Sequence, residues 1–185
     1  MSKVYVFLAE GFEEIEALTV VDLLRRAAIE VLMVSVTGNK EVTGSHQITT
    51  TADLLFEEVE YENADMLVLP GGMPGTTNLL MHDGLGRLLQ EFNSKGKLLA
   101  AICAAPKILG TKGLLNGKSA TCYPGFEDSL IGAKYLDTEV VADGNIVTSK
   151  GLGTAIDFSL SLIKRLKNEE EAQKIAKAIQ YRYYT

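Results

Sequence analysis

Cysteine is scarce in this chain of 185 residues, which contains only Cys103 and Cys122. Two cysteines cannot build the disulfide framework of a secreted scaffold, so we expect the protein to work in a reducing compartment. The sequence also lacks a cluster of cysteine and histidine at the spacing of zinc ligands. It therefore predicts no metal site, and it predicts no cofactor.

Long apolar runs and an excess of positive charge are also missing. The apolar stretch at residues 3–8 is too short for a signal peptide and lacks a cleavage region, and no segment reaches the length of a membrane span. We therefore expect a cytoplasmic protein that binds no membrane. The net charge of −6 argues against nonspecific binding of nucleic acid, which depends on lysine and arginine. The length predicts a single domain over residues 1–185, without repeats or long linkers.

Strand-like apolar runs alternate with helical patterns, which is typical of an α/β fold with a mostly parallel sheet. Strands are expected at 3–8, 30–35, 65–69 and 97–102, and helices at 13–28, 79–94, 153–166 and 169–179. Residues 42–51 are polar and β-branched, which indicates an exposed strand or hairpin arm. Asp143-Gly144 predicts a hairpin between 139–142 and 145–149. In an open α/β sheet, ligands bind beyond the carboxyl ends of the strands.

Cys103 stands at one of these ends, just before alanines that lead into a helix-like segment. At a sharp turn from strand to helix, the free N–H groups and the helix dipole favour a negative charge. We therefore predict that Cys103 is a nucleophile whose thiol ionises more readily than a free one. The alternative is a small buried hydrophobic residue, the usual state of a free cysteine.

Three glutamates, Glu13, Glu14 and Glu16, open the first expected helix. Acidic residues in a first turn interact favourably with the helix dipole, and this role is sufficient for Glu13 and Glu14. Glu16 lies on the apolar side of the helix, so we expect it to point inward. Burial raises the pKa of a carboxyl group, which then can donate a hydrogen bond or shuttle a proton.

Glycines follow two other expected strands. Gly71 and Gly72 come after residues 65–69, and Gly151 and Gly153 come after residues 145–149. Glycine is common in turns for conformational reasons alone. Because it has no Cβ, it also lets backbone N–H groups approach a ligand and stabilise an oxyanion. The segment at 149–154 does not continue as G-x-G-x-x-G, so it is not a dinucleotide-binding fingerprint.

Taken together, four segments resemble the ThiJ/PfpI (DJ-one) superfamily, in the branch of the parkinsonism-associated protein deglycase and its bacterial relatives. They are GFEEIE at 11–16, LVLPGG at 67–72, AICAAP at 101–106 and TSKGLGT at 148–154, in matching order over essentially the whole chain. The resemblance implies a flavodoxin-like three-layer α/β/α sandwich that forms a homodimer. It implies that Cys103 is the reactive, easily oxidised cysteine and that Glu16 is hydrogen-bonded to it. It also implies that Gly72 and Ala104, together with Gly71, form an anion-binding backbone site.

The chain departs from this pattern where many members of the superfamily carry a histidine near the cysteine, because Tyr123 stands there. His46 instead aligns with an arginine that many relatives use near the pocket. A Cys–His dyad and the peptidase activity that depends on it are therefore not expected. Tyr123, His46 and Gly151 are candidate pocket residues, and Tyr123 is a candidate hydrogen-bond donor. Cys122 is expected to be structural, and the alternative is a resolving partner for Cys103.

Two functions follow from the site and the resemblance. The first is a cysteine-dependent, cofactor-independent glyoxalase or deglycase that acts on small 2-oxoaldehydes such as methylglyoxal and glyoxal, and on early glycation adducts. The second is an oxidative-stress sensor or protective protein in which Cys103 is oxidised to a sulfinic acid. A role in thiazole-phosphate biosynthesis is less favoured, because the chain has no phosphate-binding loop.

Overall fold

A seven-stranded sheet forms the middle layer of the protein, which the computed structural model describes over residues 2–182. Its strands are β1 (Lys3–Leu8), β2 (Glu30–Ser35), β5 (Leu54–Leu55), β6 (Met66–Leu69), β7 (Leu98–Ile102), β10 (Val140–Asp143) and β11 (Ile146–Ser149). They are arranged in the order β10-β11-β7-β6-β1-β2-β5. Neighbouring strands are parallel except for the hairpin of β10 and β11. The expected mostly parallel sheet and its C-terminal hairpin are confirmed.

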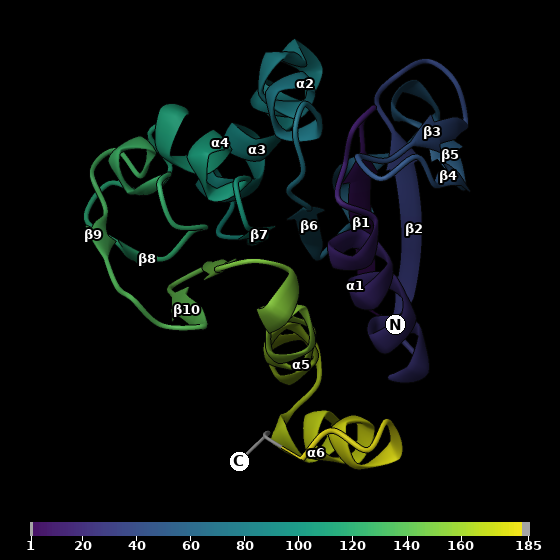
Figure 1. Ribbon diagram of the computed structural model, residues 1–185, viewed down its shortest axis with the longest axis vertical. Coiled ribbons are helices and arrows are strands. Elements are labelled where there is room, and N and C mark those ends of the chain that lie inside the picture. The colour runs from purple at the N-terminus through teal and green to yellow at the C-terminus, as the bar shows by residue number, and fades with distance from the viewer. Residues whose placement is uncertain (1, 183–185) are drawn as a thin grey trace.

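Helices cover both faces of the sheet (Figure 1). One face carries α1 (Glu14–Arg26), α5 (Ala155–Leu166) and α6 (Glu169–Ala178), and the other carries α2 (Gly75–Met81), α3 (Asp83–Ser94) and α4 (Pro106–Thr111). Alternate residues of β1 serve two separate cores, since Val6 and Leu8 pack toward α1 while Tyr5 and Phe7 pack toward α3. Both faces of the strand are apolar because both are buried. The protein is the flavodoxin-like α/β sandwich that the sequence predicts.

The segment at 79–94, which we expect to form a single helix, belongs to two helices in the structure. The spacing at 79–94 predicts continuous helix, but His82 adopts an extended conformation (φ −79°, ψ 102°) and separates α2 from α3. The Nδ1 atom of His82 accepts a hydrogen bond of 3.0 Å from the backbone N–H of Leu85 and so caps α3. The spacing of apolar residues does not reveal this break, because both helices contribute apolar side chains to the same core.

The structure has several short elements besides the strands of the main sheet and its helices. The polar segment at 42–51 forms the antiparallel hairpin of β3 (Glu41–Thr43) and β4 (Thr49–Thr51), as the pattern indicates. A further pair, β8 (Ser119–Ala120) and β9 (Lys134–Tyr135), and four 3₁₀ turns are too short to show a period. The turns are η1 (Phe56–Glu58), η2 (Tyr61–Asn63), η3 (Glu127–Ser129) and η4 (Leu152–Thr154).

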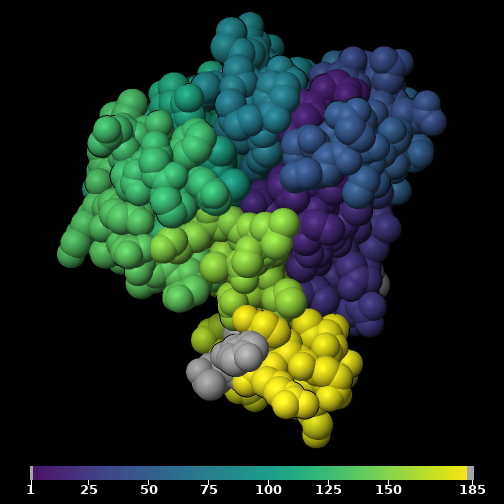
Figure 2. All heavy atoms as spheres, viewed as in Figure 1, coloured from purple at the N-terminus to yellow at the C-terminus, as the bar shows by residue number. Residues whose placement is uncertain are grey.

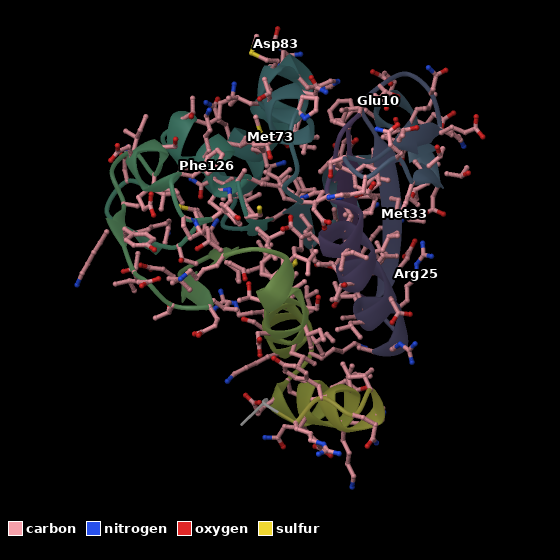
Figure 3. All side chains as sticks on the ribbon, in the orientation of Figure 1. Glu10, Arg25, Met33, Met73, Asp83 and Phe126 are labelled. Carbon is pink, nitrogen blue, oxygen red and sulfur yellow. The ribbon has the colours of Figure 1, made fainter. Side chains whose placement is uncertain are left out.

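The sheet has a switch point between β1 and β6. From β1 the chain adds β2 and β5 on one side, and then β6, β7 and β11 on the other. Loops that follow β1 and β6 therefore diverge to opposite faces and leave a crevice at the carboxyl ends of the strands, where such sheets bind ligands. Glu10, after β1, and Met73, after β6, lie at the same end of the molecule (Figure 3), and the side chain of Asn78 donates a hydrogen bond of 2.9 Å to the Glu10 carbonyl.

The opposite end of the molecule is built from the C-terminal helix. Figure 2 shows α6, in yellow, at one end, while α2, in teal, stands at the other. Helix α6 packs on α5 and contributes Ala172 and Ile175 to the core that α1 shares. Within residues 2–182, no helix has both the length and the apolar character needed to cross a membrane.

Candidate active site

Cys103 is held in a strained turn directly after β7. Its φ of 64° lies in the left-handed region, which costs energy for any residue with a Cβ. Two hydrogen bonds fix this backbone: the N–H of Cys103 donates to the Ser149 carbonyl at 3.0 Å, and the N–H of Tyr123 donates to the Cys103 carbonyl at 2.8 Å. The turn is strained and doubly anchored, and it presents a partly buried thiol at the carboxyl edge of the sheet.

Glu16 reaches this thiol from the first turn of α1. Its side chain is only 1% exposed, as the sequence predicts, and a hydrogen bond joins it to the Cys103 side chain. The backbone N–H of Gly71 donates to Glu16 Oε2 at 2.9 Å, and the N–H of Leu152 also donates to the carboxyl group. Burial outweighs these hydrogen bonds and raises the pKa of Glu16 to about 7. A carboxyl group with that pKa can both accept and donate a proton near neutral pH.

Neighbouring atoms leave no space for a side chain at Gly71 or Gly72. A Cβ on Gly71 would lie 2.6 Å from the Cβ of Cys103 and 2.7 Å from Glu16 Oε2, so any larger residue would separate the nucleophile from the carboxyl group. Gly72 has a φ of +87°, and a Cβ there would lie 2.3 Å from the backbone nitrogen of Glu13. The backbone N–H groups of Gly72 and Ala104 lie near the sulfur of Cys103 and favour its ionised form.

The acidity predicted for the thiol is wrong in direction. Burial and the adjacent carboxylate of Glu16 raise the pKa of Cys103 to about 12, and the N–H groups of Ala104 and Gly72 lower it only in part. The helix dipole contributes little, because α4 begins only at Pro106 and has six residues. A sequence pattern shows the turn but not how thoroughly the turn is dehydrated.

Cys103 and Glu16 titrate as one coupled pair. The pKa of Glu16 is raised to about 7 and that of Cys103 to about 12, so the carboxyl group ionises before the thiol. Between these two pKa values an ionised carboxyl group lies beside a neutral thiol. Glu16 is the charged neighbour that, after burial, does most to raise the pKa of the Cys103 thiol.

A cavity of about 370 Å³ lies beside Gly151, a neighbour of Glu16. Gly151 lies between Tyr123 and Glu16. A Cβ added to Gly151 would be 3.2 Å from Tyr123 Cδ2 and 3.8 Å from Glu16 Oε1. The Tyr123 ring is half-exposed and forms one wall. The lining residues are Tyr123, Pro124, Glu139, Lys150, Gly151, Leu152, Gly153 and Thr154. Tyr123 and Gly151, both candidate pocket residues from the sequence, thus line this cavity, which has room for a small substrate.

His46 lies in the hairpin between β3 and β4 and contacts the start of α1. Its backbone N–H donates to Glu14 Oε1 at 2.8 Å, and its Nδ1 lies 3.1 Å from Glu14 Oε2. Glu14 is 1% exposed and also accepts a hydrogen bond from the N–H of Ile48, so a role at the helix dipole alone does not describe it. Sequence reasoning missed this function of Glu14, because only the folded hairpin brings its donors over the first turn of α1. Within residues 2–182, one ligand atom from each of Glu13, Glu14 and His46 lies within 4.8 Å of the others.

Comparison with known proteins places the chain in a family. The DJ-1/PfpI family matches residues 2–165. The chain belongs to the DJ-1/PfpI family. This confirms the resemblance on which the sequence analysis relied.

Members of the DJ-1/PfpI family match nearly the full length of the chain. Protein dj-1beta of Drosophila melanogaster is 39% identical over 180 residues, which are 96% of this chain and 96% of the relative. A deglycase of Pyrococcus abyssi is 35% identical over 167 residues, 89% of this chain and 99% of the relative. The structure of oxidized DJ-1 from Toxoplasma gondii superposes with a TM-score of 0.95 at 41% identity, covering 99% of this chain and 100% of that one.

This DJ-1/PfpI protein shows no Cys–His dyad among its described residues. His46 contacts Glu14, and the His82 ring packs on Phe56 with ring centroids 4.5 Å apart. Cys122 is free and fully buried, and burial raises its pKa to about 11, so it has the character of a core residue.

Proposed function

We propose that this protein is a cysteine-dependent, cofactor-independent glyoxalase and deglycase. Membership in the DJ-1/PfpI family, which includes the Pyrococcus abyssi deglycase, supports a DJ-1-like deglycase or protective role. The observation that carries the finer proposal is the hydrogen-bonded pair of Cys103 and Glu16, with the N–H groups of Gly72 and Ala104 directed at the sulfur.

The first step is addition of the thiol to the aldehyde of a 2-oxoaldehyde such as methylglyoxal. The sulfur of Cys103 bonds to the aldehyde carbon while Glu16 takes the thiol proton. The carbonyl oxygen becomes an oxyanion beside the N–H groups of Gly72 and Ala104, which offset its charge. Glu16 then returns the proton to that oxygen, which leaves a neutral hemithioacetal and an ionised Glu16.

The second step moves a proton between neighbouring carbons. The Glu16 carboxylate removes the proton from the carbon bonded to sulfur, which forms an enediolate. The hydroxyl proton passes to the neighbouring oxygen, and Glu16 returns its proton to the adjacent carbon. The product is a thioester of a 2-hydroxy acid. Water hydrolyses the thioester and restores the thiol, so one methylglyoxal and one water give one lactate. An early glycation adduct enters the same sequence after its aldehyde portion transfers from the amine or thiol to Cys103.

The experiment is D-lactate formation from methylglyoxal without added glutathione. We expect turnover by the wild type, none by Cys103→Ser and a loss of at least about a hundredfold in Glu16→Ala. Cys122→Ala is the matched control and is expected to keep its activity, because Cys122 lies in the core. An active Cys103→Ser variant rules the mechanism out, and a folded, reduced wild type without turnover rules out the glyoxalase.

A second candidate function is oxidative-stress sensing at the same sulfur. The hydrogen bond from a protonated Glu16, together with the N–H groups of Gly72 and Ala104, stabilises an oxidised, anionic sulfur. One peroxide oxidises the thiol to a sulfenic acid with release of water, and a second gives the sulfinate. Mild peroxide followed by intact mass is expected to add two oxygens at Cys103 and none at Cys122. Oxidation of methionines before Cys103 contradicts this function.

We also propose that two copies associate through the outer face of α1. A groove of about 510 Å³ there is lined by Ile15, Leu18, Thr19, Asp22, Leu23, Arg26, Ile156 and Ile179. Its apolar floor and its pair of opposite charges suit a self-complementary contact. Analytical ultracentrifugation is expected to find a dimer for the wild type and a monomer for Ile15→Asp. The control Ile131→Asp, which changes an exposed isoleucine outside the groove, is expected to stay dimeric. A monomeric wild type overturns the proposal.

A further inference from the structure

Three side chains that converge beside α1 lie outside the catalytic pair. Glu13 and Glu14 come from the start of α1, and His46 comes from the β3–β4 hairpin. One ligand atom from each lies within 4.8 Å of the others. His46 Nδ1 is 3.1 Å from Glu14 Oε2 and 3.7 Å from Glu13 Oε1. Nitrogen and oxygen ligands around a tetrahedral zinc ion are about 3.3 Å apart, so these atoms can share one ion after small movements.

The charge of this group is unbalanced. Glu13 is 8% exposed and Glu14 is 1% exposed, yet neither forms an ion pair with a lysine or arginine in the described part of the chain. His46 is their one basic neighbour there, and its side chain is 70% exposed. Buried carboxylates are normally paired with a cation or bound to a metal ion. The arrangement therefore has a site for further positive charge.

One carboxylate oxygen in the group has no hydrogen-bond donor among the described residues. Glu13 Oε2 accepts from the N–H of Glu16 at 2.7 Å, which fixes the carboxylate in place. Glu13 Oε1 accepts no hydrogen bond from any described residue and points toward His46 Nδ1. This unpartnered oxygen belongs to a side chain that is nine-tenths buried, and it is evidence for a ligand that is independent of the clustering.

We propose that Glu13, Glu14 and His46 bind one divalent metal ion of the zinc class. Each carboxylate supplies one oxygen, His46 supplies Nδ1 in place of its proton, and water completes the shell on the exposed side of the imidazole. Glu14 is already oriented by the N–H groups of His46 and Ile48, at 2.8 and 3.3 Å. The sequence predicts no metal, because its ligands are separated by a helix and two strands and show no ligand spacing.

The test is isothermal calorimetry with zinc chloride in the Cys103→Ser background, which removes the competing thiol of the catalytic pair. We expect one zinc ion per chain. His46→Arg keeps a positive side chain beside Glu14 without a ligand atom, and it is expected to weaken binding at least tenfold. Glu13→Gln keeps the acceptor for Glu16 and is expected to do the same. The matched control His82→Asn alters the other histidine, keeps its cap on α3 and is expected to bind zinc like the background protein.

Two results overturn the proposal. One is zinc binding that His46→Arg and Glu13→Gln leave unchanged. The other is no heat of binding with zinc at about 100 µM, a concentration that saturates any site of micromolar affinity. Far-UV circular dichroism of each variant establishes that it is folded. A cobalt(II) titration adds a readout of its own, since loss of the visible absorption band in His46→Arg identifies the imidazole as a ligand.

Discussion

Gly71 donates a hydrogen bond to Glu16 and also packs closely against its carboxyl group. The Gly71 N–H donates to Glu16 Oε2 at 2.9 Å, and a Cβ on Gly71 would lie 2.7 Å from that same oxygen. The glycine thus orients the carboxyl group and leaves the space that lets it meet Cys103. Several consequences of this arrangement are measurable.

Gly71→Ala is expected to separate Glu16 from Cys103 and to reduce lactate formation at least about a hundredfold. The added methyl group clashes with both side chains, which costs about 1–3 kcal/mol of stability. Urea unfolding measures the second effect. Gly153→Ala is the matched control for stability, because a Cβ there meets nothing within 4 Å. Equal unfolding midpoints for the two variants contradict the packing argument.

Glu16→Gln is expected to lower the pKa of Cys103 from about 12 toward its ordinary value, because the neighbouring negative charge is removed. The rate of alkylation by iodoacetamide as a function of pH reports the pKa of the thiol. The expected midpoint is lower in Glu16→Gln than in the wild type. The same variant is expected to lose turnover, since glutamine cannot take the proton. A midpoint that rises instead shows that the Glu16 charge does not oppose ionisation.

Stability should depend on pH through Glu16. Its folded-state pKa is raised from 4.5 to about 7, so the native state binds more protons than the unfolded state in this range. The stabilising contribution is complete below pH 4.5 and is lost as pH rises through about 7. The difference in unfolding free energy between wild type and Glu16→Gln is expected to change by roughly 3 kcal/mol across this window. A Glu62→Gln control, at an exposed position, is expected to follow the wild type at every pH.

His82→Ala is expected to cost about 1 kcal/mol, because the N-cap of α3 loses its acceptor. His82→Asn supplies a side-chain oxygen at the same place and is expected to recover most of that stability. Urea midpoints of the two variants measure the difference. If both variants lose the same amount, the contact of the His82 ring with Phe56, rather than the cap, is what stabilises this junction.

Tyr123→Phe is expected to change kcat/KM by less than about threefold. The Tyr123 hydroxyl forms no hydrogen bond with a described residue, and the ring alone forms the cavity wall beside Gly151. Steady-state kinetics with methylglyoxal measure the effect. A larger loss in kcat than in 1/KM would mean that the hydroxyl acts on the reacting atoms, as the sequence analysis allowed.

The amino-acid sequence by itself determined the layers of this protein and the ends of strands where its chemistry is placed. Apolar runs such as 3–8 and 30–35 became β1 and β2 with the same bounds, because a strand buried on both faces has no polar alternative. Cys103, Gly71 and Gly72 were recognisable because turns at strand ends constrain residue type locally.

Tertiary structure alone decided the electrostatics of the site. The pKa of Cys103 rises instead of falling, because desolvation and the Glu16 charge depend on what surrounds the sulfur in space. The burial of Glu14 and its contact with His46 both depend on a hairpin that lies about thirty residues further along the chain. Spacing along the chain records which residues are neighbours in a helix or strand, whereas charge and hydration depend on every group that the fold brings near.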